Sequence, residues 1–397
     1  MLSSVQDSTR AAAGRYLAKA LFACATVPLV AACGGGSSGT GTSSTATAGS
    51  PSPTPSPAPS PTPAPASIAG LHVVGNAIQN ASGQPIVLHG VDKSGSEFAC
   101  IQNNGFFDPP GSETDGTVAA IASWTGVNAV RVPMNEDCWL AINGAPAAYS
   151  GTAYQNEIKA FVTRLTQAGL VAILDLHWNA AGTAQATGQQ PMPDADHSVT
   201  FWSQVAAAFK DNDSVIFDAY NEPYPDSNSD TTEAWRCWRD GGTCAGVSYQ
   251  VAGMQQIVTA IRAAGANNVI MLGGVQYSNA LSQWLAYKPQ DPANNLAASW
   301  HMYGGNVCSS TTCWNQAPAT VIAQVPVVAG EFGESTNGGD CSTTVVTAFT
   351  DWMDAHKGSY LAWSWNTWGG CLSLVSDTAK GTPTSTWGAF IKTRVAQ

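Results

Sequence analysis

Charged side chains are scarce in this sequence of 397 residues, and the positive ones are outnumbered by the negative ones. Only 11% of the residues are charged, 16 lysines and arginines stand against 27 acidic residues, and the formal net charge is -11. No basic stripe is available to neutralise phosphates, which argues against a nucleic-acid partner. The apolar run at 20–32 is too short for a permanent transmembrane helix.

Glycine and tryptophan, in contrast, are abundant, with 39 and 14 copies. Flat indole faces stack on sugar rings, so this composition suits a carbohydrate-handling surface. A large aromatic core with exposed loops is the other interpretation.

The first 33 residues have the features of an export signal. Arg10, Arg15 and Lys19 precede the apolar run at 20–32, which ends in Val-Ala-Ala directly before Cys33. Small residues before a cysteine resemble a bacterial lipoprotein signal, which implies cleavage before Cys33 and a lipid on its thiol. An ordinary secretory signal with an incidental cysteine is the alternative.

The segment at 34–67 is expected to be a spacer. It is rich in Gly, Ser and Thr and then alternates proline with small residues, so it has few apolar side chains to bury and favours extended polyproline II. Gly34 follows the cysteine where the inner-membrane retention pattern has aspartate. We therefore expect an exported protein, at the outer membrane or cell surface or secreted, with its folded domain at 68–397.

Eight of the ten cysteines lie in that domain, because Cys24 and Cys33 belong to the signal. An even number in an exported protein favours disulfides. Cys237–Cys244 and Cys308–Cys313 would close small loops, and Cys100–Cys138 and Cys341–Cys371 follow by elimination. A zinc site is the alternative, but no histidine lies at finger-like spacing from the segment at 237–244.

Apolar runs alternate with amphipathic stretches along the domain. Most of the runs are almost continuously apolar, as parallel strands buried on both faces should be. They lie at 86–91, 127–134, 171–178, 214–223, 268–274, 296–303, 325–333 and 360–366. Helical patterns lie at 154–168, 198–210, 249–264, 343–356 and 384–395. This alternation predicts a (β/α)8 TIM barrel, with a hairpin at 71–85 beneath it. A doubly wound open sheet is the main alternative, and it is weakened because no G-x-G-x-x-G follows the first strand.

Polar and aromatic residues gather where the predicted strands end, and a TIM barrel has its active site at that face. These residues are Arg131, Asn135, Asp175, His177, Trp178, Asn221, Glu222, His301, Tyr303, Glu331 and Trp365. Glu222 and Glu331 end strands on opposite sides of the ring, so their carboxyl groups could approach to about 5 Å, as in a retaining glycosidase. Two unrelated, solvated strand-end charges are the alternative.

Five segments in order then resemble glycoside hydrolase family 5, the cellulase family A. DAYNEPYP (218–225) is similar to its Asn-Glu-Pro signature and VVAGEFG (327–333) to its nucleophile strand. DLHW (175–178), SWHMY (299–303) and LAWSWNTWGG (361–370) are similar to its third, sixth and eighth strands. The resemblance covers the domain from about residue 68 to 397.

The resemblance implies a role for each matching residue. Glu222 would be the acid/base and Glu331 the nucleophile. Substrate-binding positions would be Asn221 at the sugar 2-hydroxyl, Tyr303 and Arg131 at the nucleophile, His177 and His301 beside the first glycone subsite, and Trp365 as its stacking platform. No metal and no organic cofactor is implied.

The substrate is less sharply defined. An endo-β-1,4-glucanase is the default that the family implies, with β-mannanase or exo-β-glycosidase as alternatives. We expect a monomer that acts on a polysaccharide or oligosaccharide and is held to a membrane by its lipid. Further subsites could be lined by Trp139, Trp178, Trp235, Trp238, Trp314 and Trp368. A lipid-anchored, non-catalytic sugar-binding protein and a structural cell-wall lipoprotein are the interpretations from other classes.

We predict that Cys33→Ala releases the protein from the membrane fraction or blocks its processing, because the thiol is the attachment point of the lipid. Membrane fractionation and mass spectrometry of the N-terminal peptide measure this. An unmodified Cys33 in the wild type, with unchanged fractionation of the variant, would contradict the prediction.

Overall fold

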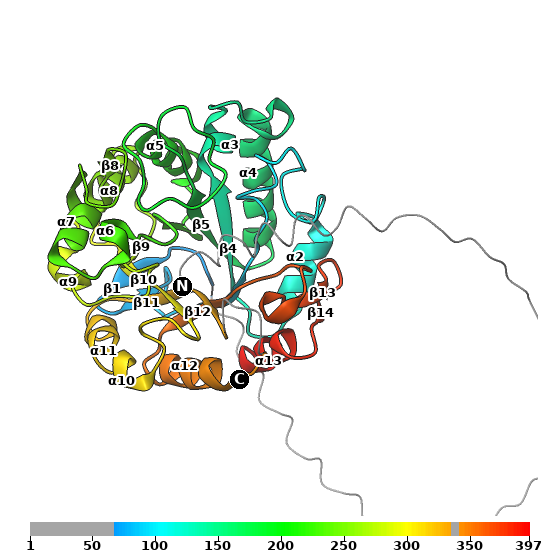
Figure 1. Ribbon diagram of the computed structural model, residues 1–397. Helices are drawn as coiled ribbons and strands as arrows, with labels where there is room; N and C mark the ends of the chain where they lie inside the picture. Colours follow the sequence, from blue (N-terminus) through cyan, green and yellow to red (C-terminus); the bar gives the residue numbers. More distant parts are fainter. Residues whose placement is uncertain (1–66, 335–340) are drawn as a thin grey trace, which may run out of the picture. The chain divides into compact units, whose positions relative to one another are not determined.

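The computed structural model describes residues 67–334 and 341–397 (Figure 1). Eight parallel strands close into a barrel, and the last strand pairs with the first. In barrel order they are β3 (His89–Asp92), β4 (Ala129–Asn135), β5 (Val171–Trp178), β6 (Val215–Asp218), β9 (Ile270–Gly273), β10 (Leu296–Tyr303), β11 (Val327–Gly333) and β12 (Ser359–Ala362). The closed ring confirms the TIM barrel and excludes the open sheet.

Helices surround the barrel (Figure 1). The longer ones are α2 (Asp115–Ala122), α4 (Thr152–Gln167), α5 (Ser198–Phe209), α7 (Thr232–Asp240), α8 (Met254–Ala263), α12 (Thr344–Ala355) and α13 (Trp387–Arg394). Short ones are α3 (Glu136–Leu140), α6 (Pro225–Asn228), α9 (Trp284–Tyr287), α10 (Thr311–Trp314) and α11 (Ala317–Ile322). The five predicted helices are all present with shifted ends.

Some boundaries differ from the sequence-based expectation because the backbone bonds elsewhere. The helix expected at 249–264 begins at Met254, since β8 (Val251–Ala252) pairs with β7 (Gly241–Gly242). The fourth barrel strand ends at Asp218 and the eighth at Ala362, earlier than predicted. A further small sheet joins β13 (Val375–Asp377) to β14 (Thr382–Pro383).

The inward face of a barrel strand changes from apolar to polar along its length. In β5, Val171 and Ile173 belong to an apolar cluster inside the barrel. Asp175 and His177 follow on the same face, because side chains alternate along a strand. The carboxyl ends of the strands therefore meet in a polar layer above an apolar one.

The predicted N-terminal hairpin is confirmed. β1 (His72–Val74) pairs antiparallel with β2 (Ala77–Gln79), and a second turn returns Pro85 to the end of β2. Leu71 and Ile78 pack in the same apolar cluster as the inward-facing residues at the barrel's amino end. The hairpin therefore covers the end of the barrel opposite the polar layer.

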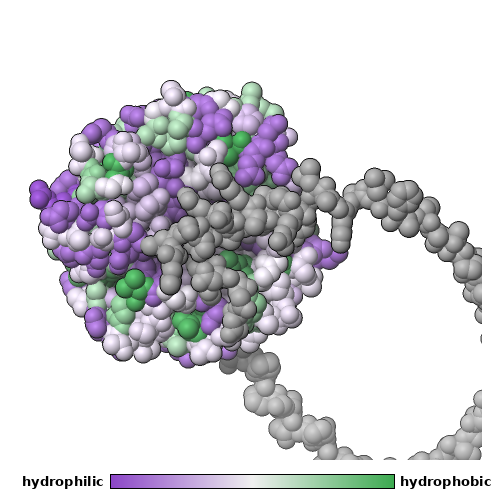
Figure 2. All heavy atoms as spheres, viewed as in Figure 1, coloured by the Kyte–Doolittle hydropathy of each residue, from purple (hydrophilic) through white to green (hydrophobic). Residues whose placement is uncertain are grey.

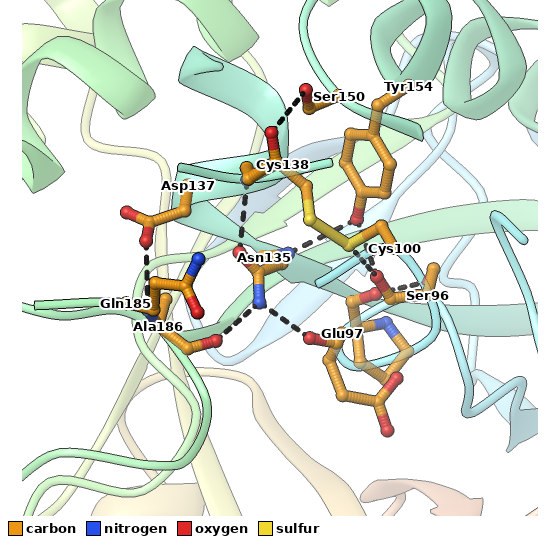
Figure 3. Close-up of a disulfide and its surroundings, with 12 residues drawn as sticks. Ser96, Glu97, Cys100, Asn135, Asp137, Cys138, Ser150, Tyr154, Gln185 and Ala186 are labelled. Atoms are coloured by element: carbon orange, nitrogen blue, oxygen red, sulfur yellow. Dashed lines mark hydrogen bonds between the residues drawn. A yellow bond between two sulfur atoms is a disulfide. The ribbon is translucent and has the colours of Figure 1, made fainter. Parts of the chain in front are cut away.

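All four predicted disulfides are present: Cys100–Cys138, Cys237–Cys244, Cys308–Cys313 and Cys341–Cys371. Figure 3 shows Cys100–Cys138, which joins the segment after β3 to α3. Because Cys237 and Cys244 are joined to each other, the alternative of a zinc site in the segment at 237–244 is excluded.

The predicted signal, the lipidation site Cys33 and all but the last residue of the spacer lie outside the described residues. Within the described ranges, no helix combines the length and apolar character needed to cross a bilayer.

The surface of the described residues offers little apolar area. Their exposed large hydrophobic side chains are Val74 and Val307. On the face shown in Figure 2, hydrophobic residues form small, separate patches among hydrophilic ones. The abundant tryptophan is mostly in the core, where ten of the largest fully buried side chains are indoles.

We predict that the long-range disulfide stabilises the fold more than the short-range one. Cys100 and Cys138 are separated by 38 residues and Cys308 and Cys313 by 5. The loop-entropy estimate is about 4 kcal/mol for the first and about 2 kcal/mol for the second. Urea unfolding of the two double Cys→Ser variants tests this, and the reverse order of stability would contradict it.

Candidate active site

Arg131 is the centre of the polar layer. It lies on β4 with its side chain fully buried, and four carboxylates from four other strands surround its guanidinium. Nη1 lies 2.8 Å from Glu331 Oε1 and 3.2 Å from Asp92 Oδ1, and Nε lies 2.9 Å from Asp218 Oδ2. Nη2 lies 3.0 Å from Asp175 Oδ2 and donates to Asn221 Oδ1 at 2.9 Å.

One buried cation cannot balance four carboxylates. Burial raises the pKa of Asp92 well above its ordinary value, that of Asp175 to about 7 and that of Asp218 to about 8, although Arg131 acts in the opposite direction. Burial therefore disfavours the ionised form of these aspartates, and the charge of Arg131 counteracts it. Burial works to lower the pKa of Arg131, but the carboxylates more than offset it, so the guanidinium stays charged.

Glu331 reaches the cluster through an irregularity in β11. The pairing register of β10 and β11 shifts between Trp300 and His301, so that His301 lies opposite Glu331. A β-bulge of this kind re-aims a side chain. Gly330 precedes it, and a Cβ there would lie 2.9 Å from Ser299 Oγ and 3.0 Å from His301 Nε2, tighter than ordinary packing. Glycine at this position lets Glu331 enter the barrel.

Both oxygens of Glu331 accept hydrogen bonds. Arg131 Nη1 donates to Oε1, and the Tyr303 hydroxyl donates to Oε2 at 2.8 Å. The bond from the arginine is charge-assisted, so the carboxyl group is held firmly in place. Arg131 and Tyr303 thus lie where the family resemblance implied.

Glu222 lies beyond the end of β6 in a different environment. Its Oε1 is 3.0 Å from His301 Nδ1, and its Oε2 accepts from Gln189 Nε2 at 3.2 Å. Burial raises the pKa of Glu222 to about 7, while His177, Gln189 and Arg131 act to lower it. Burial also lowers the pKa of His301 to about 3 and that of His177 to about 4, so both rings are neutral at pH 7.

The two glutamates are close together. Ligand-type atoms of Glu222, His301 and Glu331 all lie within 4.8 Å of one another. Retaining glycosidases separate their carboxyl groups by about 5–5.5 Å and inverting ones by about 6.5–9.5 Å, so the geometry is of the retaining type. The same spacing could hold a metal ion, as could that of Asp194, Asp196 and His197 before α5.

His177 lies beside the pair, where it was expected. Its Nδ1 is 2.6 Å from Asp175 Oδ2, and its ring stacks on Trp363 with centroids 5.7 Å apart and planes 12° apart. Trp363 is only half-buried and follows Leu361 of the inward apolar cluster by two residues.

Trp365 is not at the site, and its assignment as the stacking platform is wrong. Its side chain is 0% exposed, packs edge-on against Trp124 at 4.8 Å and donates its indole N–H to Thr378. The error follows from the strand end: β12 stops at Ala362, so Trp365 lies outside the strand whose end the prediction used. Trp363 therefore takes the position expected for Trp365.

Two further aromatic groups are formed by residues of the loops and strand ends, and the second of them interacts with Glu222. Phe98 lies 6.1 Å from Trp178 and 5.8 Å from Trp368 between ring centroids. Tyr224 and Tyr277 stack at 4.7 Å, and the charge of Glu222 adds to the burial that raises the pKa of both. Of the other predicted subsite residues, the fully buried ones are Trp139, Trp235, Trp238 and Trp314.

Sequence reasoning missed Trp363, Phe98, Tyr277, Gln189 and Asp92. The alternation from Leu361 could have identified Trp363, and Asp92 ends β3 as the other polar residues end their strands. Gln189 lies in a loop, where no periodicity exists to identify it.

A parallel barrel whose polar mouth pairs two carboxyl groups, one held by an arginine, defines a glycoside hydrolase. The particular family follows from comparison with known proteins. The sequence matches the cellulase family, glycosyl hydrolase family 5, over residues 83–369. The chain therefore belongs to that family.

Two relatives and one solved structure show what else the chain is similar to. A mannan endo-1,4-beta-mannosidase of Salipaludibacillus agaradhaerens is 22% identical, over 75% of this chain and 82% of that protein. Endoglucanase MaCel5A of Microbulbifer sp. is 20% identical, over 75% of this chain and 51% of that protein. The beta-glucanase SdGluc5_26A of Saccharophagus degradans, solved with cellotetraose, superposes with a TM-score of 0.62 at 18% identity, over 82% of this chain and 92% of that one.

We predict opposite consequences for the two neighbouring tryptophans. Trp363→Ala should lower kcat/KM on the order of tenfold, because a half-exposed stacking face is lost, with little change in stability. Trp365→Ala should lower the free energy of unfolding by about 3–5 kcal/mol, because it empties a core position. Kinetics and urea unfolding of both variants measure this. Loss of activity without loss of stability in Trp365→Ala would restore the original assignment.

Proposed function

We propose that this protein is a retaining endo-β-1,4-glucanase in which Glu331 is the nucleophile and Glu222 the acid/base. The observation that carries the proposal is the contrast between two carboxyl groups within 4.8 Å of each other. Glu331 accepts from an arginine and a tyrosine, whereas burial raises the pKa of Glu222 to about 7. One is suited to attack as an anion and the other to donate a proton.

The reaction would proceed in two displacements. Glu331 attacks the anomeric carbon while Glu222 gives its proton to the departing glycosidic oxygen. Glu222 then removes a proton from water, whose oxygen attacks the anomeric carbon and releases Glu331. Asn221 would hold the sugar 2-hydroxyl, with His177, His301 and Trp363 around the first glycone subsite.

The preference for β-glucan and for internal cleavage has separate support. The names of the endoglucanase relative and of the glucanase solved with cellotetraose point to β-glucan. The aromatic groups Trp178–Phe98–Trp368 and Tyr224–Tyr277 would offer stacking faces for further sugar units of a chain, which an endo-acting enzyme needs. Rates on β-glucan, mannan and aryl glycosides decide between this and β-mannanase, which the mannosidase relative favours.

The protein would act at the outer membrane or cell surface through lipid on Cys33, with residues 34–67 as a spacer. The lipoprotein-like signal and the proline-rich composition support this location. A non-catalytic sugar-binding protein would not need the pair Glu222 and Glu331.

We predict different phenotypes for the two glutamates. Glu331→Gln should abolish turnover of every substrate, because no ionised oxygen remains to attack. Glu222→Ala should lose roughly 10²- to 10⁴-fold on natural glycosides, which need protonation of the leaving oxygen. On activated aryl glycosides its covalent intermediate should accumulate, and azide should rescue turnover and give a β-glycosyl azide.

Two results would contradict the mechanism. Inverted configuration of the first-formed product, observed by NMR, would exclude double displacement. Azide rescue of the position 331 variant but not of the position 222 variant would mean that the two roles are reversed. Intact-protein mass spectrometry of Glu222→Ala measures the intermediate directly.

A further inference from the structure

Gln189, in the loop between β5 and α5, contacts Glu222 directly. Its Nε2 lies 3.2 Å from Glu222 Oε2 and 3.0 Å from the Glu222 backbone oxygen. Both neighbours are acceptors, so the amide must turn its nitrogen towards them, where it can only donate. His301 Nδ1, on the other oxygen, can donate or accept according to its tautomer. Gln189 therefore supplies a donor to Glu222 whatever the state of His301.

The loop is fixed on both sides of Gln189 without using its side chain. Ala186 donates its N–H to Asp137 Oδ2 at 2.9 Å and accepts from Asn135 Nδ2 at 2.8 Å, as Figure 3 shows. On the other side, the Tyr220 hydroxyl donates to the Gln190 oxygen at 2.7 Å. The backbone N–H of Tyr224 donates to the Pro191 oxygen at 2.9 Å.

Because these anchors are independent of the Gln189 amide, its contact with Glu222 is not needed to hold the loop. The amide is preorganised at the carboxyl group, as a residue that serves the reaction would be.

Several charged or titratable groups also face Glu222 from the surrounding strands and loops. They are Arg131 on β4, Asp175 and His177 on β5, His301 and Tyr303 on β10, and Glu331 on β11. The tyrosines Tyr224 and Tyr277 complete the set. A negative charge on Glu222 is opposed by Asp175, by Glu331 and by any tyrosine in its ionised form. The neutral amide donor of Gln189 offsets part of that repulsion.

We propose that Gln189 is a positioning residue for the acid/base, and that its amide supports the Glu222 carboxylate during the second displacement. The inference rests on the proposed function, because only a retaining mechanism makes Glu222 act first as an acid and then as a base. After Glu222 has given up its proton, the amide stabilises the anion and holds it in the geometry from which it removes a proton from water.

The consequence is a split between two kinetic parameters. An activated aryl β-cellobioside forms the covalent intermediate without help from an acid, so its kcat/KM reports the first displacement and its kcat the second. Loss of the donor disfavours ionised Glu222 and raises its pKa, so the second step should slow at and below neutral pH and recover as the pH rises.

The test compares Gln189→Met with Gln185→Met, using 2,4-dinitrophenyl β-cellobioside and soluble β-glucan. Gln185 lies in the same loop, is exposed and donates to the Gly144 oxygen, away from Glu222. For Gln189→Met we expect kcat on the aryl glycoside to fall about tenfold at pH 6, the range expected for a lost hydrogen bond to a charged group. Azide should restore it, and the basic limb of kcat/KM on β-glucan should move to higher pH. Gln185→Met should match the wild type.

Gln189→Glu, which has the same shape, provides the second variant. Its carboxylate would add a like charge beside Glu222 and should move the basic limb further in the same direction. An unshifted basic limb in both variants would overturn the proposal. The proposal would also be overturned if kcat and kcat/KM on the aryl glycoside fell together and azide did not restore them. That is the result expected of a purely structural residue. If the wild type itself acts on neither substrate, the proposed function fails instead.

Discussion

The buried guanidinium of Arg131 is the interaction on which the active-site end of the barrel depends. It joins β4 to carboxylates on β3, β5, β6 and β11, and so fixes strands that are distant in sequence to one point. A buried charge is costly unless it is paired, and here each of the three nitrogens donates to an oxygen. Removing the cation would leave several carboxyl groups uncompensated in the core, so stability and catalysis rest on the same side chain.

The two glutamates differ because their supports differ. Glu331 belongs to the barrel strand β11 and follows the bulge in it, and its two donors come from two other barrel strands, β4 and β10. Glu222 lies past the strand end, and its oxygens contact one histidine on β10 and one amide in a loop. The same chemical group therefore accepts from an arginine and a tyrosine in one place and is buried with a raised pKa in the other. Environment rather than residue type divides the two roles.

The sequence alone predicts those features of the fold and the site that depend on local periodicity. The eight strands follow from apolar runs, and the candidate residues Glu222, Glu331, Arg131, His301 and Tyr303 from the polar ends of those runs. Two disulfides follow from the small loops that they close, and the other two follow by elimination. It failed at Trp365, because where β12 stops depends on backbone bonds with other segments. Gln189 could not be foreseen either, since its contact joins two loops 33 residues apart.

The loop that carries Glu222 is held by a neighbouring turn in an unfavourable conformation. Gln276, Tyr277 and Ser278 all have positive φ, between 56° and 59°, which non-glycine residues rarely adopt. In return, this turn makes three hydrogen bonds. The Ser278 hydroxyl donates to the Asn221 backbone oxygen at 2.9 Å, and the Tyr277 backbone N–H donates to the Pro223 oxygen. The His301 backbone N–H donates to the Ser278 oxygen at 3.0 Å. Three hydrogen bonds to the Asn-Glu-Pro turn and its histidine offset the local strain. The acid/base is therefore positioned by contacts between loops, and substitutions in those loops should affect it sooner than they affect the nucleophile, which the barrel itself holds.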